Sequence, residues 1–265
     1  MAEKLVMATS AVEAAGLKNS ESAFLAGGTE DNRLNSTVDA ATLISIGRIP
    51  ELDGISKDGE CIRIGAMATF QEILDNELIP EYLKDACRFM GSRTKRNMAT
   101  IGGNIALRRT DSYLYPTLLA SHAMLDLMDA NGNVSKKCVC CYLKDYEELK
   151  DNLIVAVSVP KEAKVASKRY ANTVQSHAVL TVSAGIADGK LRVGVAAKDT
   201  ALKGLCDVAT ALQEKDLSDA DILKLIEADK DLCFKQDIFG SPEYKRYLLA
   251  VTIADLARKV KGGAK

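Results

Sequence analysis

The chain has 265 residues, of which 47% are hydrophobic and 27% charged, with 35 basic and 36 acidic side chains and a net charge of −1. This composition is typical of a globular protein with one large domain or two smaller ones. A nucleic-acid-binding protein is expected to carry a basic excess, which is absent here. No stretch approaches the ~18 uninterrupted apolar residues of a membrane span, and the N-terminus lacks a signal peptide's apolar run. We therefore expect a cytoplasmic protein that binds neither nucleic acid nor membranes.

The first half of the chain reads as short strands and helices joined by clear turn and capping signals. After an amphipathic opening over residues 1–20, we expect strands at 23–25, 43–46 and 61–64. Thr69-Phe70-Gln71-Glu72 is a capping box that starts a helix. Pro80 suits the first turn of another helix, which Gly91 can end in a left-handed conformation.

Two pairs of adjacent glycines are the most informative local motif. The strand at 23–25 leads directly into Gly27-Gly28, which is the context that a phosphate-binding loop requires. Gly102-Gly103 lies between apolar β-formers and follows a basic segment. In that segment Lys95 is interpreted as a solvated surface residue, whereas Arg93 and Arg96 either neutralise a bound pyrophosphate or belong to the same solvated face. Glycines let a ligand approach the main chain, and exposed amides can form an anion-binding nest. Two such loops predict a diphosphate held from two sides.

The second half predicts two hairpins and a change of domain. Asn131-Gly132 is a hairpin turn, and residues 153–159 form an apolar strand that Pro160 closes. A polar run from Lys161 marks the predicted boundary between domains 1–160 and 161–265. Strands at 178–187 and 190–197 flank a second turn, Asp188-Gly189.

Two helices complete the predicted C-terminal domain. Ser218 caps the first, and Ser241-Pro242 opens the second. Tyr244, Tyr247, Leu248 and Val251 are expected to face inward on that last helix. An antiparallel sheet with helices on one face is an α+β arrangement.

The cysteines and histidines predict no catalytic site of their own. Seven cysteines are an odd number for a disulfide framework, and four isolated ones, Cys61, Cys87, Cys206 and Cys233, are expected to be buried thiols. Cys138, Cys140 and Cys141 are either structural thiols or an iron–sulfur or zinc site; their close spacing favours thiols. His122 is expected on a helix, and His177 at the start of a strand beside Ser176, where neighbouring side chains point to opposite faces.

The two glycine motifs resemble one known family. Ala26-Gly27-Gly28-Thr29-Glu30 followed by Asn97-Met98-Ala99-Thr100-Ile101-Gly102-Gly103-Asn104-Ile105-Ala106 is similar to the FAD-binding medium subunit of molybdenum hydroxylases, the xanthine dehydrogenase-like and carbon monoxide dehydrogenase-like complexes. The resemblance continues in the family's order over nearly the whole chain, at residues 63–66, 116–120, 155–160 and 241–246.

The resemblance implies a two-subdomain FAD-binding domain of the vanillyl-alcohol-oxidase-like type, followed by a small α+β domain. It implies an oxidoreductase subunit that passes electrons from iron–sulfur clusters of a partner through FAD to NAD or another acceptor, in a complex with a molybdopterin-binding large subunit. This chain would hold no metal and no catalytic residue of its own. The alternatives are a stand-alone FAD-dependent reductase and a flavin-free assembly subunit, which the altered segment 108–113 would suit.

The resemblance also assigns FAD contacts residue by residue. Ile154 would help to cover the isoalloxazine ring, and Lys168 would be the basic residue near the flavin. Without gaps, the family's acidic residue aligns to Tyr113, whereas Asp111-Ser112 matches the family's Asp-Ser pair two residues early. We expect Asp111 to be the acidic residue that contacts FAD. The complete predicted set is Leu25, Ala26, Gly27, Gly28, Thr29, Glu30, Thr100, Gly102, Gly103, Asn104, Asp111, Ile154 and Lys168.

Overall fold

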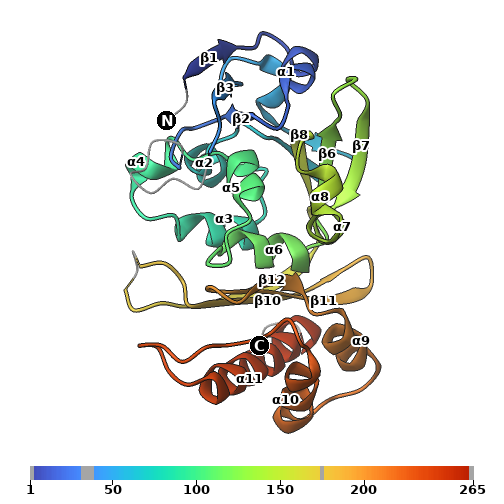
Figure 1. Ribbon diagram of the computed structural model, residues 1–265. Helices are drawn as coiled ribbons and strands as arrows, with labels where there is room; N and C mark the ends of the chain where they lie inside the picture. Colours follow the sequence, from blue (N-terminus) through green and yellow to red (C-terminus); the bar gives the residue numbers. More distant parts are fainter. Residues whose placement is uncertain (1–2, 31–38, 174–175, 263–265) are drawn as a thin grey trace. The chain divides into compact units, whose positions relative to one another are not determined.

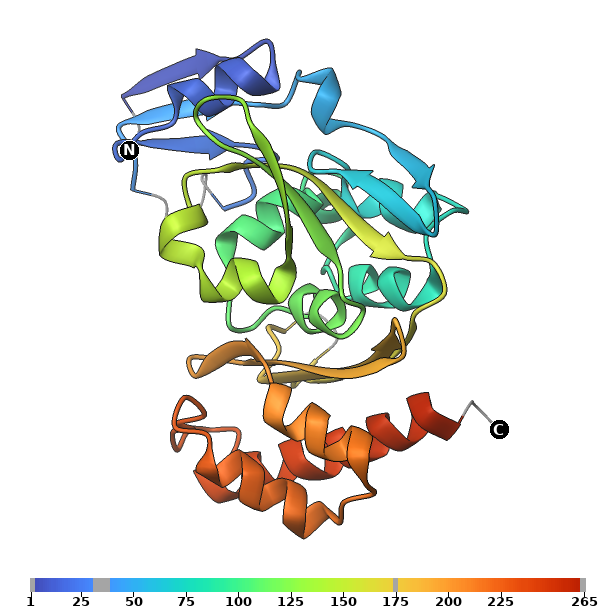
Figure 2. The same ribbon diagram turned by 90° about the vertical axis from the view of Figure 1, so that its right-hand side faces the viewer.

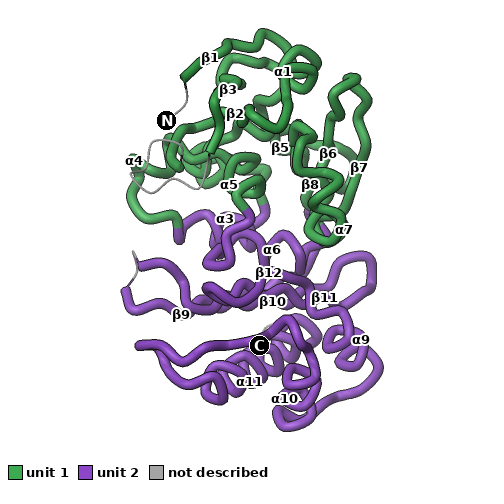
Figure 3. Tube along the Cα trace, in the orientation of Figure 1, with its two compact units in different colours: residues 1–79, 90–107, 123–159 green, residues 80–89, 108–122, 160–265 purple. Residues whose placement is uncertain are grey.

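A computed structural model describes residues 3–30, 39–173 and 176–262, so the first two residues of the predicted opening lie outside it. The chain divides into two compact units, each assembled from separate segments (Figure 3). The first unit comprises residues 1–79, 90–107 and 123–159, and the second comprises 80–89, 108–122 and 160–265. Two segments of the first 160 residues thus belong to the same unit as the C-terminal part. The domain boundary at residue 160 stays a prediction.

The first unit begins with a small parallel sheet. Its strands β1 (Lys4–Met7), β3 (Thr42–Ser45) and β2 (Ser22–Leu25) lie in the order β1-β3-β2. Helix α1 (Ala11–Leu17) begins after Ser10, whose side chain accepts a hydrogen bond from the amide of Glu13. Its buried alanines and Ile44 of β3 share one hydrophobic core. Val12 and Leu17 of the predicted opening are instead exposed.

A five-stranded sheet forms the rest of the first unit's framework. Its order is β4-β5-β8-β6-β7, from β4 (Ile55–Asp58), β5 (Cys61–Gly65), β8 (Leu153–Pro160), β6 (Met124–Met128) and β7 (Val134–Cys138). The predicted turn at Asn131-Gly132 is confirmed, with φ of 84° at Gly132, and Gly59 between β4 and β5 likewise has a positive φ of 58°. Seven consecutive residues of β8 are buried, as expected for a central strand.

Short helices connect these strands. They are the 3₁₀ helix Pro50–Leu52, α2 (Phe70–Asp75), α4 (Arg93–Arg96), α5 (Ile101–Leu107), α7 (Val139–Lys144) and α8 (Tyr146–Leu149). The capping box at Thr69 and Glu72 is confirmed in both directions. Arg96 hydrogen-bonds to Gln71 and to the carbonyl oxygens of Met90 and Gly91, so it braces the chain before α5. Arg93 and Lys95 are exposed.

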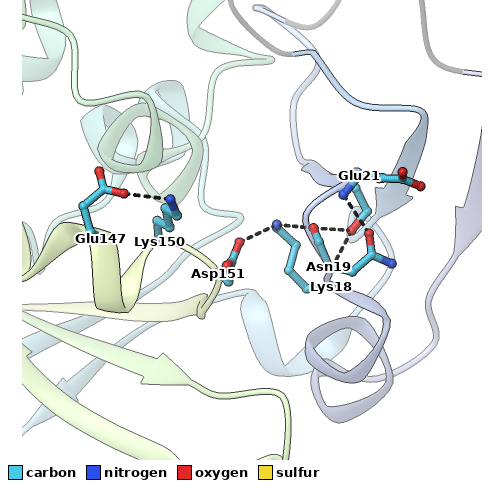
Figure 4. Close-up of polar contacts among 7 residues, drawn as sticks. Lys18, Asn19, Glu21, Glu147, Lys150 and Asp151 are labelled. Atoms are coloured by element: carbon cyan, nitrogen blue, oxygen red, sulfur yellow. Dashed lines mark hydrogen bonds and ion pairs between the residues drawn. The ribbon is translucent and has the colours of Figure 1, made fainter.

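An ion pair fixes the turn that leads into β2. Lys18 Nζ lies 2.6 Å from Asp151 Oδ1 and donates to the carbonyl oxygen of Asn19 at 2.8 Å (Figure 4). The amide of Glu21 donates to Asn19 Oδ1 at 2.9 Å. Because Asp151 lies two residues before β8, these bonds join the turn before β2 to the segment before the central strand of the other sheet. They help to position the glycine loop that follows β2.

The second unit is built on one antiparallel sheet. Its order is β12-β11-β10-β9, from β12 (Ala201–Gly204), β11 (Lys190–Ala197), β10 (Leu180–Ala187) and β9 (Lys164–Tyr170). The predicted hairpin is confirmed, with Ala187 paired to Lys190 and positive φ at both turn residues, Asp188 and Gly189.

Helices cover both faces of this sheet, not one face as the sequence predicted. Helices α9 (Cys206–Glu214), α10 (Asp219–Ala228) and α11 (Pro242–Gly262) lie on one side, whereas α3 (Glu81–Arg88) and α6 (Leu114–Ala120) lie on the other (Figures 1 and 2). Seven of the eight residues of β10 are buried, and because alternate side chains of a strand point to opposite faces, both faces of the sheet must be covered. The Ser218 cap of α10 is confirmed.

Four local predictions were wrong. Helix α3 ends at Arg88, and Gly91 does not have a positive φ. His122 follows α6 with φ of 59° and lies outside the helix, where its Nδ1 contacts Asp188 Oδ2 at 2.9 Å. Tyr244 and Tyr247 of α11 are about half exposed. Of the four isolated thiols expected in the core, only Cys87 is buried.

Within the three described ranges, no helix combines the length and apolar character needed to cross a lipid bilayer.

Candidate functional site

The first glycine loop lies directly against another segment of the first unit. Strand β2 ends at Leu25, as predicted, and Gly28 adopts φ of 66°, a conformation that favours glycine. A Cβ added to Gly27 would stand 1.7 Å from the carbonyl oxygen of Met98. The loop can therefore approach the chain before α5 this closely only because residue 27 has no side chain.

The second glycine pair is the first turn of helix α5, not a loop after a strand. Three of the segment's amides already have acceptors within the chain. Ile101 and Gly102 donate to the carbonyl oxygens of Ala68 and Ala66 at 3.0 and 2.9 Å, and Gly103 donates to Thr100 Oγ1 at 3.1 Å. The predicted nest of exposed amides is thus replaced by a packed helix start. Of these bonds, the one from Gly103 to a rotatable hydroxyl is the easiest for a ligand to replace.

The two glycine segments meet, as the sequence predicted. A Cβ built on Gly103 would lie 3.6 Å from Ala26 Cβ and 2.9 Å from Thr100 Oγ1. One turn of α5 brings Asn104 to the same region, and its Oδ1 is buried without a hydrogen-bond partner among the described residues. An unpaired buried acceptor is costly, and a ligand hydroxyl would satisfy it. The main-chain cradle and this acceptor together fit a large polar ligand such as a dinucleotide.

Ile154 is confirmed as a buried residue of β8, with 6% exposure, in register with Leu127 of β6. Its side chain is therefore part of the core of the sheet. Its predicted role as cover for the flavin ring stays a prediction.

Asp111 belongs to the second unit, where it is already paired. Arg109 donates to both of its carboxylate oxygens, at 2.9 and 2.8 Å, and His177 Nδ1 lies 2.9 Å from Oδ2. Burial would raise the pKa of Asp111, but the hydrogen bonds and positive charge of Arg109 and the charge of His177 outweigh it and lower the pKa below its usual value. The sequence offered no signal for the contact with His177, which lies 66 positions away.

Aromatic residues stand beside this carboxylate cluster. Tyr113, the residue that the gapless alignment favoured, packs edge-on against Phe89 with ring centroids 6.1 Å apart. Burial raises the pKa of Tyr113, so its hydroxyl stays protonated. The guanidinium of Arg169 lies over the Phe89 ring, 5.2 Å from its centroid. Lys168 is exposed on β9, with Nζ 5.4 Å from the centroid of the Tyr170 ring.

We expect the Asp111 cluster to stabilise the second unit in a pH-dependent way. Because the pKa is lowered on folding, the stabilisation is complete above the unfolded value of about 3.9 and is lost as the pH falls through the folded value. Asp111→Asn should lower the free energy of unfolding near neutral pH by about 1–2 kcal/mol. The difference from the wild type should shrink towards pH ~3. Urea unfolding followed by circular dichroism measures both.

Asp255→Asn, on the exposed side of α11, is the matched control and should leave the pH profile unchanged. A wild-type profile in the Asp111 variant would show that the cluster contributes nothing to stability.

Comparison with known proteins agrees with this arrangement. Residues 2–162 match the family described as the FAD binding domain in molybdopterin dehydrogenase. An uncharacterized protein, YgfM, of Escherichia coli K12 is 32% identical over 242 residues, which cover 89% of this chain and 86% of YgfM. The nicotine 6-hydroxylase medium subunit of Paenarthrobacter nicotinovorans is 24% identical over 85% of this chain and 83% of its own length.

Solved structures share the fold. A chain of reconstituted carbon monoxide dehydrogenase from Oligotropha carboxidovorans superposes with a TM-score of 0.81 at 18% identity, and the match covers 100% of this chain and 99% of that one. Quinoline 2-oxidoreductase from Pseudomonas putida 86 gives 0.78 at 20% identity, covering 100% and 98%.

The α+β fold and the family match over residues 2–162 therefore define an FAD-binding domain of the oxidoreductase type. The chain belongs to the family of FAD-binding domains of molybdopterin dehydrogenases, the medium-subunit class of the molybdenum hydroxylases. Its cofactor is FAD.

Proposed function

We propose that this chain is the electron-transfer medium subunit of a molybdenum hydroxylase-like complex, which passes electrons from iron–sulfur clusters of a partner through FAD to NAD or a comparable acceptor. The observation that carries the proposal is the meeting of the Gly27-Gly28 loop with the first turn of α5, beside Asn104 Oδ1, which has no hydrogen-bond partner in the described part of the chain. This arrangement gives a diphosphate-bearing ligand a main-chain cradle and a hydroxyl group an acceptor.

The residues of the first unit would divide the binding of FAD between them. The main chain at residues 26–30 would hold the pyrophosphate, where Gly28 supplies the left-handed turn. Thr100 and Asn104 would contribute a hydroxyl and an amide oxygen, and Ile154 would contribute apolar surface. Gly102 and Gly103 would keep side chains out of the contact between α5 and its neighbours. Asp111 and Lys168 would contribute the further contacts to FAD that the family resemblance implies.

FAD supplies the chemistry that the chain's own side chains lack, since it exchanges electrons with one-electron and two-electron partners. The protein's part is to bind it, orient it and limit its access to water. The names of several relatives support an assembly with other chains: they include the glyceraldehyde dehydrogenase medium chain of Sulfolobus acidocaldarius and the carbon monoxide dehydrogenase medium chain of Hydrogenophaga pseudoflava. We infer that an iron–sulfur subunit and a molybdopterin-binding large subunit are the partners of this chain.

The purified chain is expected to be yellow and to release FAD, not FMN, on denaturation, as measured by absorption spectroscopy and chromatography of the released flavin. Alone, the FAD-loaded chain should be reduced slowly by NADH and should oxidise no hydroxylase substrate. In the reconstituted complex, substrate oxidation should reduce the flavin, and removal of the clusters should interrupt that reduction.

Each failure has a distinct meaning. A chain that remains colourless after supplementation with FAD would contradict the cofactor site. Rapid turnover of an organic substrate by the isolated chain would contradict the subunit role and favour a stand-alone reductase. Flavin reduction that continues after cluster removal would contradict the electron path alone.

A further inference from the structure

Three cysteines gather where strand β7 passes into helix α7. Cys138 ends β7 and is the N-cap of α7, and Cys141 lies one turn further on. The amide of Cys141 donates to Cys138 Sγ at 3.1 Å, and the Cys138 thiol donates to Cys141 Sγ at 2.7 Å. The two sulfurs are therefore only about 0.7 Å further apart than the ~2.05 Å of a disulfide bond. Cys140, between them in sequence, is exposed.

The scaffold around this pair is well anchored. Cys138 is in register with Met124 of β6, and the amide of Val139 donates to the carbonyl oxygen of Ala123 at 3.0 Å. On α7, Val139 and Tyr142 are 1% and 2% exposed. The buried side of α7 thus fixes the helix while the two sulfurs lie on its accessible side, where Cys138 is half-buried and Cys141 exposed. Because both sulfurs are held together before any bond forms, closing the ring between them costs little chain entropy.

We propose that Cys138 and Cys141 form a reversible dithiol–disulfide site that exchanges with disulfides of the low-molecular-weight thiol class. The spacing of two intervening residues at the start of a helix is that of known redox-active cysteine pairs. Among the described residues, no group of three or more metal-ligating side chains includes this pair, so a closed metal site lacks ligands there.

The exchange balances in two steps. Cys138 loses its proton to solvent, and its thiolate attacks one sulfur of the external disulfide, which forms a mixed disulfide and releases one external thiolate that takes up a proton. Cys141 then loses its proton to solvent and attacks the Cys138 sulfur, which forms the intrachain disulfide and releases the second external thiol. The two chain thiols are oxidised, and the external disulfide is reduced to two thiols. The hydrogen bond shared with Cys138, with burial adding to it, raises the pKa of Cys141. Cys141 therefore keeps its proton beside the Cys138 thiolate, which suits it to act second.

The test uses the full-length, FAD-loaded protein in a series of glutathione redox buffers. Samples are quenched with acid, alkylated and mapped by mass spectrometry, where an intrachain disulfide appears as the loss of two hydrogen atoms from the Cys138–Cys141 peptide. Half-oxidation of this pair is expected at a glutathione disulfide concentration at least about tenfold below that which half-modifies the exposed Cys206.

Serine variants identify the partners. Cys140→Ser should leave the midpoint unchanged, whereas Cys138→Ser and Cys141→Ser should lose the intrachain bond and carry glutathione on the remaining cysteine. A serine at position 138 can still cap α7, and thermal unfolding checks that each variant is folded. The proposal is overturned if Cys206 of the wild type becomes modified by glutathione while no Cys138–Cys141 disulfide has formed. It is also overturned if the intrachain disulfide is lost in Cys140→Ser.

Discussion

Gly27→Ala is expected to abolish FAD binding. The new Cβ would stand 1.7 Å from the carbonyl oxygen and 2.8 Å from the carbonyl carbon of Met98, and neither main-chain atom can move independently of the helix start that follows. The loop after β2 must therefore separate from the segment before α5, at a cost of roughly 3 kcal/mol. Separation takes apart the cradle that the two segments form. The flavin-to-protein ratio of the purified variant measures the loss.

Gly47→Ala is the matched control for this prediction. Apart from its two chain neighbours, no described residue has a heavy atom within 4 Å of the position that its Cβ would occupy, and its φ is not positive. It should retain the wild-type flavin content. Amide hydrogen exchange in β10 and β11 should stay slow in both variants, because these strands belong to the second unit. Full flavin occupancy in Gly27→Ala would show that the loop is not part of the cofactor site.

Gly194→Ala is expected to destabilise the second unit strongly. This glycine of β11 lies beneath α6, and its Cβ would stand 2.6 Å from the carbonyl oxygen and 2.9 Å from the Cα of Pro116. Because α6 is buried along its whole length, it cannot shift away without opening the core. We expect the free energy of unfolding to fall by about 3 kcal/mol, measured as a lower urea midpoint for the loss of circular dichroism.

Gly262→Ala, near the end of α11, should be neutral or slightly stabilising because, apart from its chain neighbours, no described residue comes within 4 Å of the added Cβ. An unchanged urea midpoint in Gly194→Ala would mean that the sheet and α6 are not packed as closely as the structure shows.

Local sequence determined the turns and helix starts. Gly59, Gly132 and both residues of the turn Asp188-Gly189 have positive φ angles, which these residue types tolerate. The caps at Thr69 and Ser218 form as predicted. Each of these features depends on residues within about four positions of one another. The same holds for the end of β2 at the first glycine loop. The approach of the two glycine segments was predicted from their common chemistry, but the helical form of the second was not.

The buried face of helix α11 is not determined by its local sequence pattern. Its sequence carries two apolar stripes, and the stripe that includes Tyr244 and Tyr247 was predicted to face inward. The structure buries Leu249, Ile253 and Leu256 instead, together with Lys245. Lys245 tolerates burial because its Nζ lies 2.7 Å from Asp237 Oδ1 and donates to the carbonyl oxygen of Lys235 at 2.8 Å. Which of the two stripes is buried is determined by the sheet on which the helix packs.

Only the tertiary structure decided the contacts on which the site and the second unit depend. The carbonyl oxygen of Met98 against Gly27, His177 beside Asp111, and α6 over Gly194 each join residues more than sixty positions apart. The cysteine pair at the start of α7 is local in sequence, yet the anchoring of α7 holds its two sulfurs in contact. Hydrophobic periodicity and helix capping depend only on interactions between residues that are close in sequence. Pairings between distant segments depend on the burial and packing of the whole chain, which no local window contains.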